Sequence, residues 1–323
     1  MNDSDLENKE PPFTFRAVQI FVAAVEAASV TKAAHRLGIS PSSVSQQLAS
    51  LEAALGTKLI LRSARQFRLT RSGETFLLSA KHLLDDVGAA KAKLVMVDQE
   101  PPMALKIASI EELDATVTAA WLLALSKSFP NISFSLSSGA SHDNHDALSS
   151  RAVDMTLAVD TVASVDWVEQ HPILRDPFIL VCARGSGGNI DANKPLVRYS
   201  SDLLIGRQIE AQLRRTGITA NRGFEFSSNQ AFFSMIAELG GWGITTALAY
   251  LGTPLATDIV DAHPLPIPQF SRRLALHARA GALGNLPAHI AAQMRLSIEE
   301  RILPEADLRL SFVRDGLQII HES

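Results

Sequence analysis

Cysteine is almost absent from the chain, since Cys182 is the only one in 323 residues. A single cysteine excludes an internal disulfide and a zinc site built from several cysteines. This usage is typical of a reducing compartment, so we expect a cytoplasmic protein. No hydrophobic run reaches the length of a membrane span, and the polar, acidic start MNDSDLENKE is unlike a signal peptide. We therefore expect no contact with a membrane.

The common local signatures of enzymes are also missing. The chain contains no GxSxG elbow, no P-loop, no GxGxxG after a strand and no HExxH. The densest group of metal-binding residue types is the run from His142 to Asp146. We expect this run to be a loop in which Asp143 or Asn144 caps the next helix, because no other cluster of ligands is visible. The sequence predicts no enzyme, no metal site and no cofactor.

Charge is distributed unevenly along the chain. The net charge is −4, with 30 Lys and Arg against 34 Asp and Glu. The segment from Arg16 to Arg71 nevertheless carries about +6, which leaves about −10 for the remainder. A basic N-terminal part on an acidic body is typical of a nucleic-acid-binding head joined to a second domain.

The stretch from Thr31 to Leu55 reads as two short helices joined by a tight turn. Gly38 can adopt the positive φ that ends a helix. Ser40 is a good N-cap, and Pro41 suits the first helical position. In the second helix an apolar stripe recurs at helical spacing, at Val44, Leu48, Leu51 and Leu55.

Small or hydrogen-bonding side chains lie on the other side of that second helix, namely Ser42, Ser43, Ser45, Gln46 and Ala49. Such residues at the start of a helix can reach base edges in a major groove. Plain packing of a helix pair with a polar outer face is the alternative. The neighbouring segments favour DNA binding, because residues 15–28 supply a third amphipathic helix and residues 59–70 read as a β-hairpin wing. Near the wing tip lie three arginines suited to phosphates or a minor groove: Arg62, Arg65 and Arg68.

The run AAHRLGISPSSVSQQLASLEAALGTKLILR…RLTRSGE resembles the winged helix-turn-helix of LysR-type transcriptional regulators. The resemblance covers about the first ninety residues closely. It implies an all-α winged helix-turn-helix domain over 14–70 and double-stranded operator or promoter DNA as the partner. The polar, acidic composition of the first residues predicts a disordered tail over 1–13. The DNA contacts that we expect are Thr31, Ser42, Ser43, Ser45, Gln46, Arg62, Arg65 and Arg68.

After the wing, Thr70 or Ser72 can cap a long helix over residues 71–97. Apolar residues recur at coiled-coil spacing, at Phe76, Ala80, Leu83, Val87, Ala90, Leu94 and Val97. The alternative is an amphipathic helix packed on its own domain. The resemblance implies a linker helix that forms a homodimer, and a homotetramer if effector domains also pair.

A polar, proline-stopped hinge at 98–102 precedes a β-α-β-α-β order that calls for a parallel sheet. We expect an α/β domain at 103–304, in which a helix opens at Ser109 and runs to about Phe129. The resemblance implies two Rossmann-like subdomains similar to periplasmic solute-binding proteins, at 103–164 with 269–304 and at 165–268. The sequence does not predict how the segment 305–323 fits into the fold.

Ligands of open α/β sheets bind where parallel strands end and helices begin, and helix N-termini favour anions. The sequence therefore predicts a small, anionic effector bound by Ser109, Ser137, Ser138, Arg198, Ser200, Ser201, Asn229 and Thr245. Each has a structural alternative. Ser109 can cap its own helix, Arg198 can pair with Asp202, and Asn229 can help to cap the helix that follows it.

Two functions remain open at this point. The leading one is a ligand-responsive DNA-binding transcriptional regulator. The alternative is a solute-binding or enzymatic α/β domain that carries a helix-turn-helix incidentally.

Overall fold

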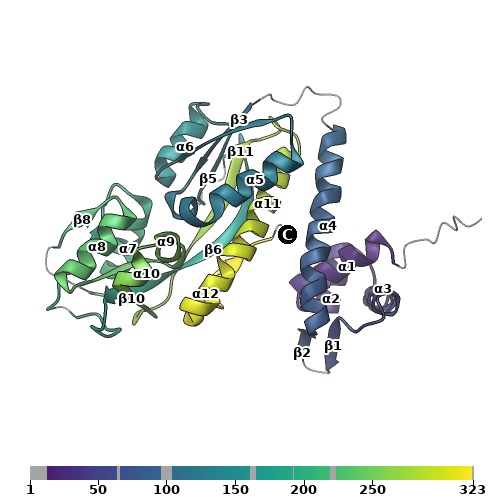
Figure 1. Ribbon diagram of the computed structural model, residues 1–323, viewed down its shortest axis with the longest axis horizontal. Coiled ribbons are helices and arrows are strands. Elements are labelled where there is room, and N and C mark those ends of the chain that lie inside the picture. Colours follow the sequence, from purple (N-terminus) through teal and green to yellow (C-terminus); the bar gives the residue numbers. More distant parts are fainter. Residues whose placement is uncertain are drawn as a thin grey trace, which may run out of the picture. The chain divides into compact units, whose positions relative to one another are not determined.

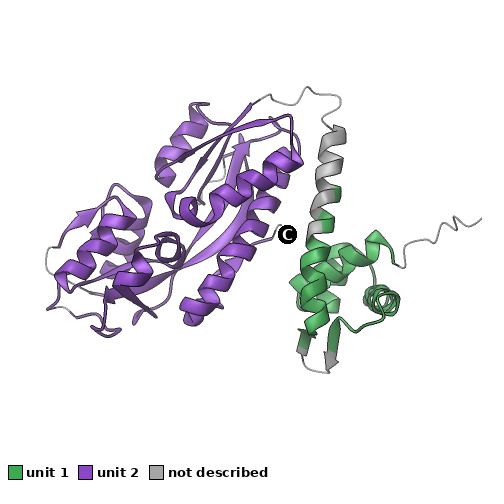
Figure 2. Cartoon of the chain, in the orientation of Figure 1, with its two compact units in different colours: residues 1–91, 323 green, residues 92–322 purple. Residues whose placement is uncertain are grey.

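The computed structural model describes residues 13–63, 66–95, 104–160, 165–191, 193–218 and 223–321, without the side chains of residues 62, 63, 66, 82, 85, 86 and 88–95. The chain forms two compact units, residues 1–91 with residue 323, and residues 92–322 (Figure 2). Outside this description lie the predicted hinge at 98–102, the tail through residue 12, Arg65 and Val97. The same holds for the side chains of Arg62, Ala90 and Leu94.

Unit 1 begins with three short helices, followed by a hairpin and a long helix (Figure 1). These elements are α1 (Phe15–Glu26), α2 (Val30–Leu37), α3 (Pro41–Ala54), β1 (Ile60–Ser63), β2 (Gln66–Leu69) and α4 (Arg71–Val95). The turn between α2 and α3 has the predicted chemistry. Gly38 has φ +65° after α2, and the Ser40 hydroxyl accepts the Ser43 N–H at 3.1 Å at the start of α3. Local sequence signals therefore account for the helix-turn-helix.

The start of α4 is fixed by a side-chain cap, as the sequence predicted. The Thr70 hydroxyl accepts the Gly73 N–H at 2.9 Å and donates to the Lys58 carbonyl at 2.6 Å. The second bond ties the helix start to the chain that enters the wing.

Part of the predicted coiled-coil face of α4 packs within unit 1 instead. The Phe76 ring contacts Phe13 and Phe21, with ring centroids 6.1 Å and 5.3 Å apart, and Ala80 is buried. For these two positions the alternative of packing on the own domain is correct, because Phe76 and Ala80 complete the core of α1. Leu83 lies on the helix with 41% of its surface exposed.

Unit 2 is built on one eight-stranded sheet. In its first part β3 (Ala104–Ser109) pairs in parallel with β4 (Ser133–Ser138) and β5 (Met155–Val159), which confirms the predicted parallel order. Neighbouring residues of β3 point to opposite faces. Ile107 joins the core beneath α5 (Ala119–Ser128) and α11 (Leu286–Arg301), whereas Ala108 packs under α6 (Ser141–Ser149).

Two long strands connect this part of unit 2 to the next. The 16-residue β6 (Val168–Ala183) pairs antiparallel with β11 (Ser271–Arg279) along its first part and with β9 (Trp242–Thr246) and β10 (Val260–His263) along its last part. The remaining elements there are β7 (Arg198–Tyr199), α7 (Leu204–Arg215), β8 (Glu225–Phe226), α8 (Asn229–Leu239), α9 (Ala247–Gly252) and α10 (Ala256–Ile259).

Several segments of unit 2 differ from the sequence predictions. The helix expected from Ser109 to Phe129 is a 3-10 turn η2 (Glu111–Leu113), a π turn η3 (Asp114–Thr118) and α5. The His142–Asp146 run is helical within α6 rather than a loop. The unplaced C-terminal segment forms α12 (Leu303–Arg309), η4 (Ser311–Val313) and β12 (Gln318–Ile319), which pairs with β6.

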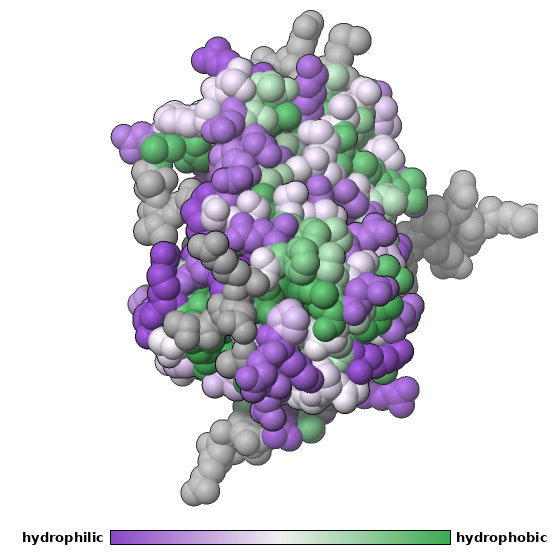
Figure 3. Space-filling model, turned by 90° about the vertical axis from the view of Figure 1, so that its left-hand side faces the viewer, coloured by the Kyte–Doolittle hydropathy of each residue, from purple (hydrophilic) through white to green (hydrophobic). Residues whose placement is uncertain are grey.

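The surface of unit 2 mixes polar and apolar residues. Figure 3, which looks onto the side of α7 and α8 in Figure 1, shows hydrophilic residues around a hydrophobic area near its centre. Among the described helices none is long and apolar enough to cross a bilayer.

Candidate functional site

The outer face of α3 presents the polar residues predicted to meet DNA. Ser42, Ser43 and Gln46 are exposed, and Ser45 is half-buried. The Ser42 and Ser43 hydroxyls each lie 2.8 Å from the Ser40 hydroxyl. Their side chains are therefore ordered at the helix start, beside the exposed Gln46.

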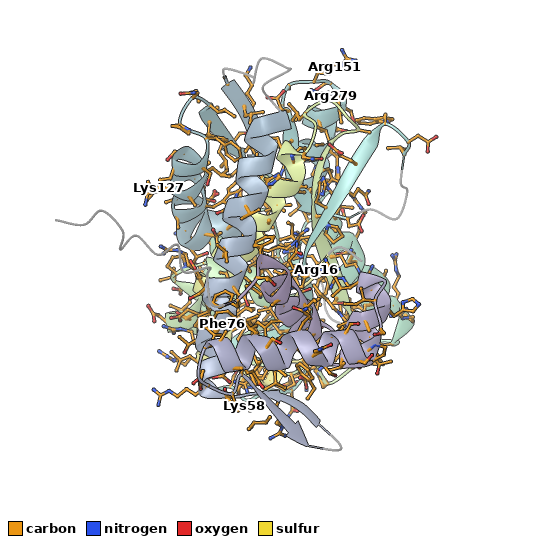
Figure 4. The ribbon with its side chains drawn as sticks, turned by 90° about the vertical axis from the view of Figure 1, so that its right-hand side faces the viewer. Arg16, Lys58, Phe76, Lys127, Arg151 and Arg279 are labelled. Atoms are coloured by element: carbon orange, nitrogen blue, oxygen red, sulfur yellow. The ribbon has the colours of Figure 1, made fainter. Side chains whose placement is uncertain are left out.

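A buried carboxylate fixes the wing to α3. Glu52 is 4% exposed, and its Oε1 accepts the N–H groups of Leu59 and Ile60 at 3.0 and 3.1 Å. Its Oε2 lies 2.8 Å from Lys58 Nζ, and Figure 4 labels Lys58 where the chain enters the hairpin. Burial alone raises the pKa of Glu52, but the Lys58 and backbone hydrogen bonds outweigh burial and leave that pKa lowered. Glu52 therefore stays ionised and sets the start of β1 relative to α3.

Unit 1 also carries exposed basic side chains, among them Arg16, Lys32, Lys58, Arg68 and Arg71. Thr31, at the start of α2, is also exposed. The head thus combines a hydrogen-bonding helix face with cations that can meet phosphates.

Unit 2 contains a cleft with a free internal volume of about 60 Å³, or about 490 Å³ when the open space at its mouth is counted. One wall comes from segments around η2, α6 and β5, and the other from segments around β7, α7 and α8. The lining residues are Ile110, Glu111, Glu112, Gly139, Ala140, Ser141, Val159, Tyr199, Leu203, Leu204, Ile205, Ser227, Asn229 and Arg272.

A buried ionic network lies at this cleft. The Arg272 guanidinium donates from Nε to Asp176 at 2.9 Å and from Nη2 to Glu112 at 2.8 Å and Thr246 at 3.1 Å. Burial works against its charge, but Glu112 and Asp176 outweigh burial and raise the pKa of Arg272. Asp176 also accepts the Leu248 N–H at 3.0 Å. The network joins η2, β6, β9 and β11, so it ties the wall of the cleft at η2 to the two long strands β6 and β11.

A second network consists of neutral groups. The Tyr199 hydroxyl donates to Asn229 Oδ1 at 2.7 Å and lies 2.9 Å from the Thr245 hydroxyl. Burial is the main cause of a raised pKa at Tyr199, so the phenol stays protonated. Tyr199 and Asn229 face the cleft, and Thr245 lies behind them.

The predicted effector residues are dispersed around this cleft. Of the eight, Asn229 is among the described lining residues and the other seven are not. Ser137 and Ser138 are exposed on β4, where Ser138 donates to Asp114 at 2.8 Å. Arg198 is ion-paired with Glu210 rather than with Asp202.

Ser109, Ser200 and Ser201 lie at strand ends as expected, but they do not line the cleft. Ser109 is fully buried, and within the described part of the chain its hydroxyl has no hydrogen-bond partner. It is not a cap, because Ile110 occupies the N-cap position of η2. The Ser200 hydroxyl accepts the Asp202 N–H at 3.2 Å, and Ser201 is exposed. Ser228 caps α8, and Asn229 is the first residue of that helix.

The charged residues of the cleft were missed at the sequence level. Glu111 and Glu112 follow β3 directly, and this position was the available signal. The contacts of Arg272 with Glu112 and Asp176 span 160 and 96 residues. No local pattern reports such pairs.

The predicted capping role of Asp143 and Asn144 is wrong, because α6 has Ala140 at its N-cap without a side-chain bond. Asn144 instead donates to the Ser109 carbonyl at 2.8 Å. Across the described residues, no group of three or more His, Cys, Asp or Glu is arranged to hold a metal ion.

Comparison with known proteins matches both units to one family. Residues 15–74 match the "Bacterial regulatory helix-turn-helix protein, lysR family" model, and residues 98–294 match the "LysR substrate binding domain" model. The transcriptional regulator YfeR of Shigella flexneri is 25% identical over 283 residues, covering 83% of this chain and 92% of YfeR.

CzcR of Bacillus cereus is 27% identical over 233 residues, covering 71% of this chain and 78% of CzcR. The solved structure of CrgA from Neisseria meningitidis shares the fold, with a TM-score of 0.53 and 19% identity over 88% of this chain and 98% of CrgA. With its DNA-binding helix-turn-helix and its effector-binding domain, the chain belongs to the LysR family of transcriptional regulators.

Proposed function

We propose that α3 reads operator DNA in a major groove while the wing contacts the adjacent backbone or minor groove. The observation that carries this proposal is the set of bonds from Glu52 on α3 to Leu59, Ile60 and Lys58, which we call the Glu52 clamp. The clamp fixes the position of the wing relative to the exposed face of α3. The proposed DNA contacts are Thr31, Ser42, Ser43, Ser45, Gln46, Arg62, Arg65 and Arg68.

We also propose a dimer formed through α4 beyond its buried first turns, with a tetramer if effector domains pair as well. The exposed Leu83 supports this, because an apolar side chain on a helix surface is stabilised by a partner. The proposed domain limits remain 14–70, 71–97 and 103–304, with subdomains at 103–164 plus 269–304 and at 165–268. A cytoplasmic location and a purely regulatory, non-enzymatic role are parts of the same proposal.

The effector is proposed to occupy the cleft lined by Asn229, Tyr199 and Glu112. Its binding shifts the population of two arrangements of the dimer, which requires a different affinity for each. Direct contacts at Ser109, Ser137, Ser138, Arg198, Ser200, Ser201 and Thr245 remain predictions.

A gel-shift assay on the DNA upstream of the protein's own gene, at one stated salt concentration, tests this function. We expect a specific complex that random DNA does not compete away. Gln46→Ala should weaken specific binding by about 1–3 kcal/mol and leave binding to random DNA nearly unchanged, because a base-edge contact carries sequence information.

Gln230→Ala is the matched control, because this glutamine is exposed on α8 in the other unit. It should bind like wild type. Equal losses on specific and random DNA for Gln46→Ala would remove this residue from base reading, and absence of any specific complex would contradict the proposed function.

A further inference from the structure

The sign of the charge at the effector cleft differs from the sequence prediction. Among the described residues that line it, the charged ones are Glu111, Glu112 and Arg272. Burial raises the pKa of Glu111, and the neighbouring charges of Glu112 and Asp114 raise it further. Glu111 therefore lies in a negative local potential, and a cation placed beside it would relieve the repulsion.

Arg272 does not offset this potential for a ligand. Its Nε and Nη2 atoms already donate to Asp176, Glu112 and Thr246, and its side chain is 3% exposed. One guanidinium therefore faces two carboxylates before any ligand arrives. Arg198, the cation expected from the sequence, is engaged by Glu210. The cleft offers an anion no uncommitted arginine among its described lining residues.

The uncharged residues of the lining indicate the chemical character of the rest of the ligand. Ile110, Val159, Leu203, Leu204 and Ile205 form the apolar part of a lining that also contains polar side chains. An aliphatic or aromatic group would be removed from water against these side chains. Small ligand sites commonly combine such walls with a few polar groups that fix orientation.

We propose that the cleft binds a small organic cation, with an ammonium group at Glu111 and Glu112 and an apolar body against the leucine and isoleucine wall. This assignment rests on the proposed function, since it specifies the effector of that same cleft. It replaces the anionic effector expected from the sequence.

Glu112 links the proposed ammonium site to the long strand β11. Its carboxylate lines the cleft and also binds Arg272 on β11. The backbone of η2 packs closely against α9. A Cβ at Gly252 would collide with the Glu112 carbonyl, so this contact requires glycine. A cation at Glu112 would therefore weaken the attraction between Glu112 and Arg272. Ligand binding in the cleft would thus change the ionic network that joins β6, β9 and β11.

The test compares pentylamine, pentanoate and 1-pentanol, which share one apolar chain and differ in charge. Thermal unfolding of the full-length protein is followed by tryptophan fluorescence over a concentration series of each probe. We expect pentylamine to raise the melting temperature more than 1-pentanol does, and pentanoate to raise it least. Glu111→Gln should weaken pentylamine binding by about threefold to fivefold, as for a solvent-accessible charge pair.

Glu238→Gln is the control for general charge effects, because Glu238 is exposed on α8 and does not line the cleft. It should keep the wild-type response to pentylamine. The inference is overturned if pentanoate stabilises the protein more than pentylamine, if pentylamine has no effect, or if both variants lose the response equally. None of these results alters the gel shift with operator DNA, so failure of the charge assignment is distinguishable from failure of the proposed function.

Discussion

Protonation of one buried histidine should make unit 2 sensitive to acid. His277 on β11 is 1% exposed, and neither ring nitrogen makes a hydrogen bond of normal geometry to any described residue. Its ring packs against His145 with centroids 4.8 Å apart. Burial first, and then His145, lowers the pKa of His277 from 6.5 to about 4.

The sign and size of the effect follow from proton linkage. Below pH 6.5 the unfolded chain binds a proton at this histidine, whereas the folded chain binds it only near pH 4. Lowering the pH through this window therefore favours unfolding. A shift of about 2.5 pKa units corresponds to about 3 kcal/mol of stability lost between pH 7 and pH 4.

Urea unfolding of the full-length protein at several pH values measures this loss. All three tryptophans, Trp121, Trp167 and Trp242, belong to unit 2, so their fluorescence follows that unit alone. His277→Leu should match or exceed wild-type stability at pH 7, because it removes a buried imidazole that lacks normal hydrogen bonds. Between pH 7 and 4 it should lose about 3 kcal/mol less than wild type.

His289→Leu is the control, because this half-buried histidine lies on α11 and bonds the Asn285 carbonyl. Its pH profile should run parallel to that of wild type. If His277→Leu also runs parallel to wild type, the folded protein accepts the proton at His277 as readily as the unfolded chain does, and the reasoning from burial is refuted.

Three further outcomes follow from contacts in the two units. Glu52→Gln should speed hydrogen exchange at the Leu59 amide, consistent with a loss of about 1–3 kcal/mol at neutral pH. This difference should disappear as the pH falls through the lowered pKa of Glu52, and unchanged exchange would contradict the clamp. Leu83→Asp should weaken the dimer at least about tenfold in sedimentation equilibrium, whereas Leu78→Asp, exposed off the predicted seam, should not; a monomeric wild type would contradict the seam. Deleting residues 317–323 should cost unit 2 about 2–4 kcal/mol in urea unfolding, because β12 bonds β6 and Leu317 is buried; an unchanged midpoint would count against this.

The head was predictable because its signals are local. Gly38, Ser40 and Pro41 specify a turn and a helix start within a few residues, and the structure has both. The first part of the helix over residues 141–149 was not predictable in the same way. Its polar residues have weak helix propensity. Contacts with distant strands stabilise it, including Asn144 to the Ser109 carbonyl and His145 to the Val159 carbonyl.

The first part of β6 has no local strand signal for a related reason. It contains polar residues and two prolines, and its Asp176 is paired with Arg272 from a strand that lies 96 residues away. The effector cleft depends on the same long-range pairs. Its general position between two subdomains followed from the family resemblance, but the identity and sign of its charges required the structure.

The continuity of β6 has a mechanical consequence. This strand is hydrogen-bonded to β11 along one part and to β9 and β10 along the other, so the two halves of the effector unit share a paired ribbon. A free loop hinge would let the halves rotate with little resistance. A pair of hydrogen-bonded strands can bend and twist, and it resists larger displacements because its hydrogen bonds would break. We therefore expect any ligand-driven motion at the cleft to bend and twist β6 and β11 rather than to turn about a single loop residue.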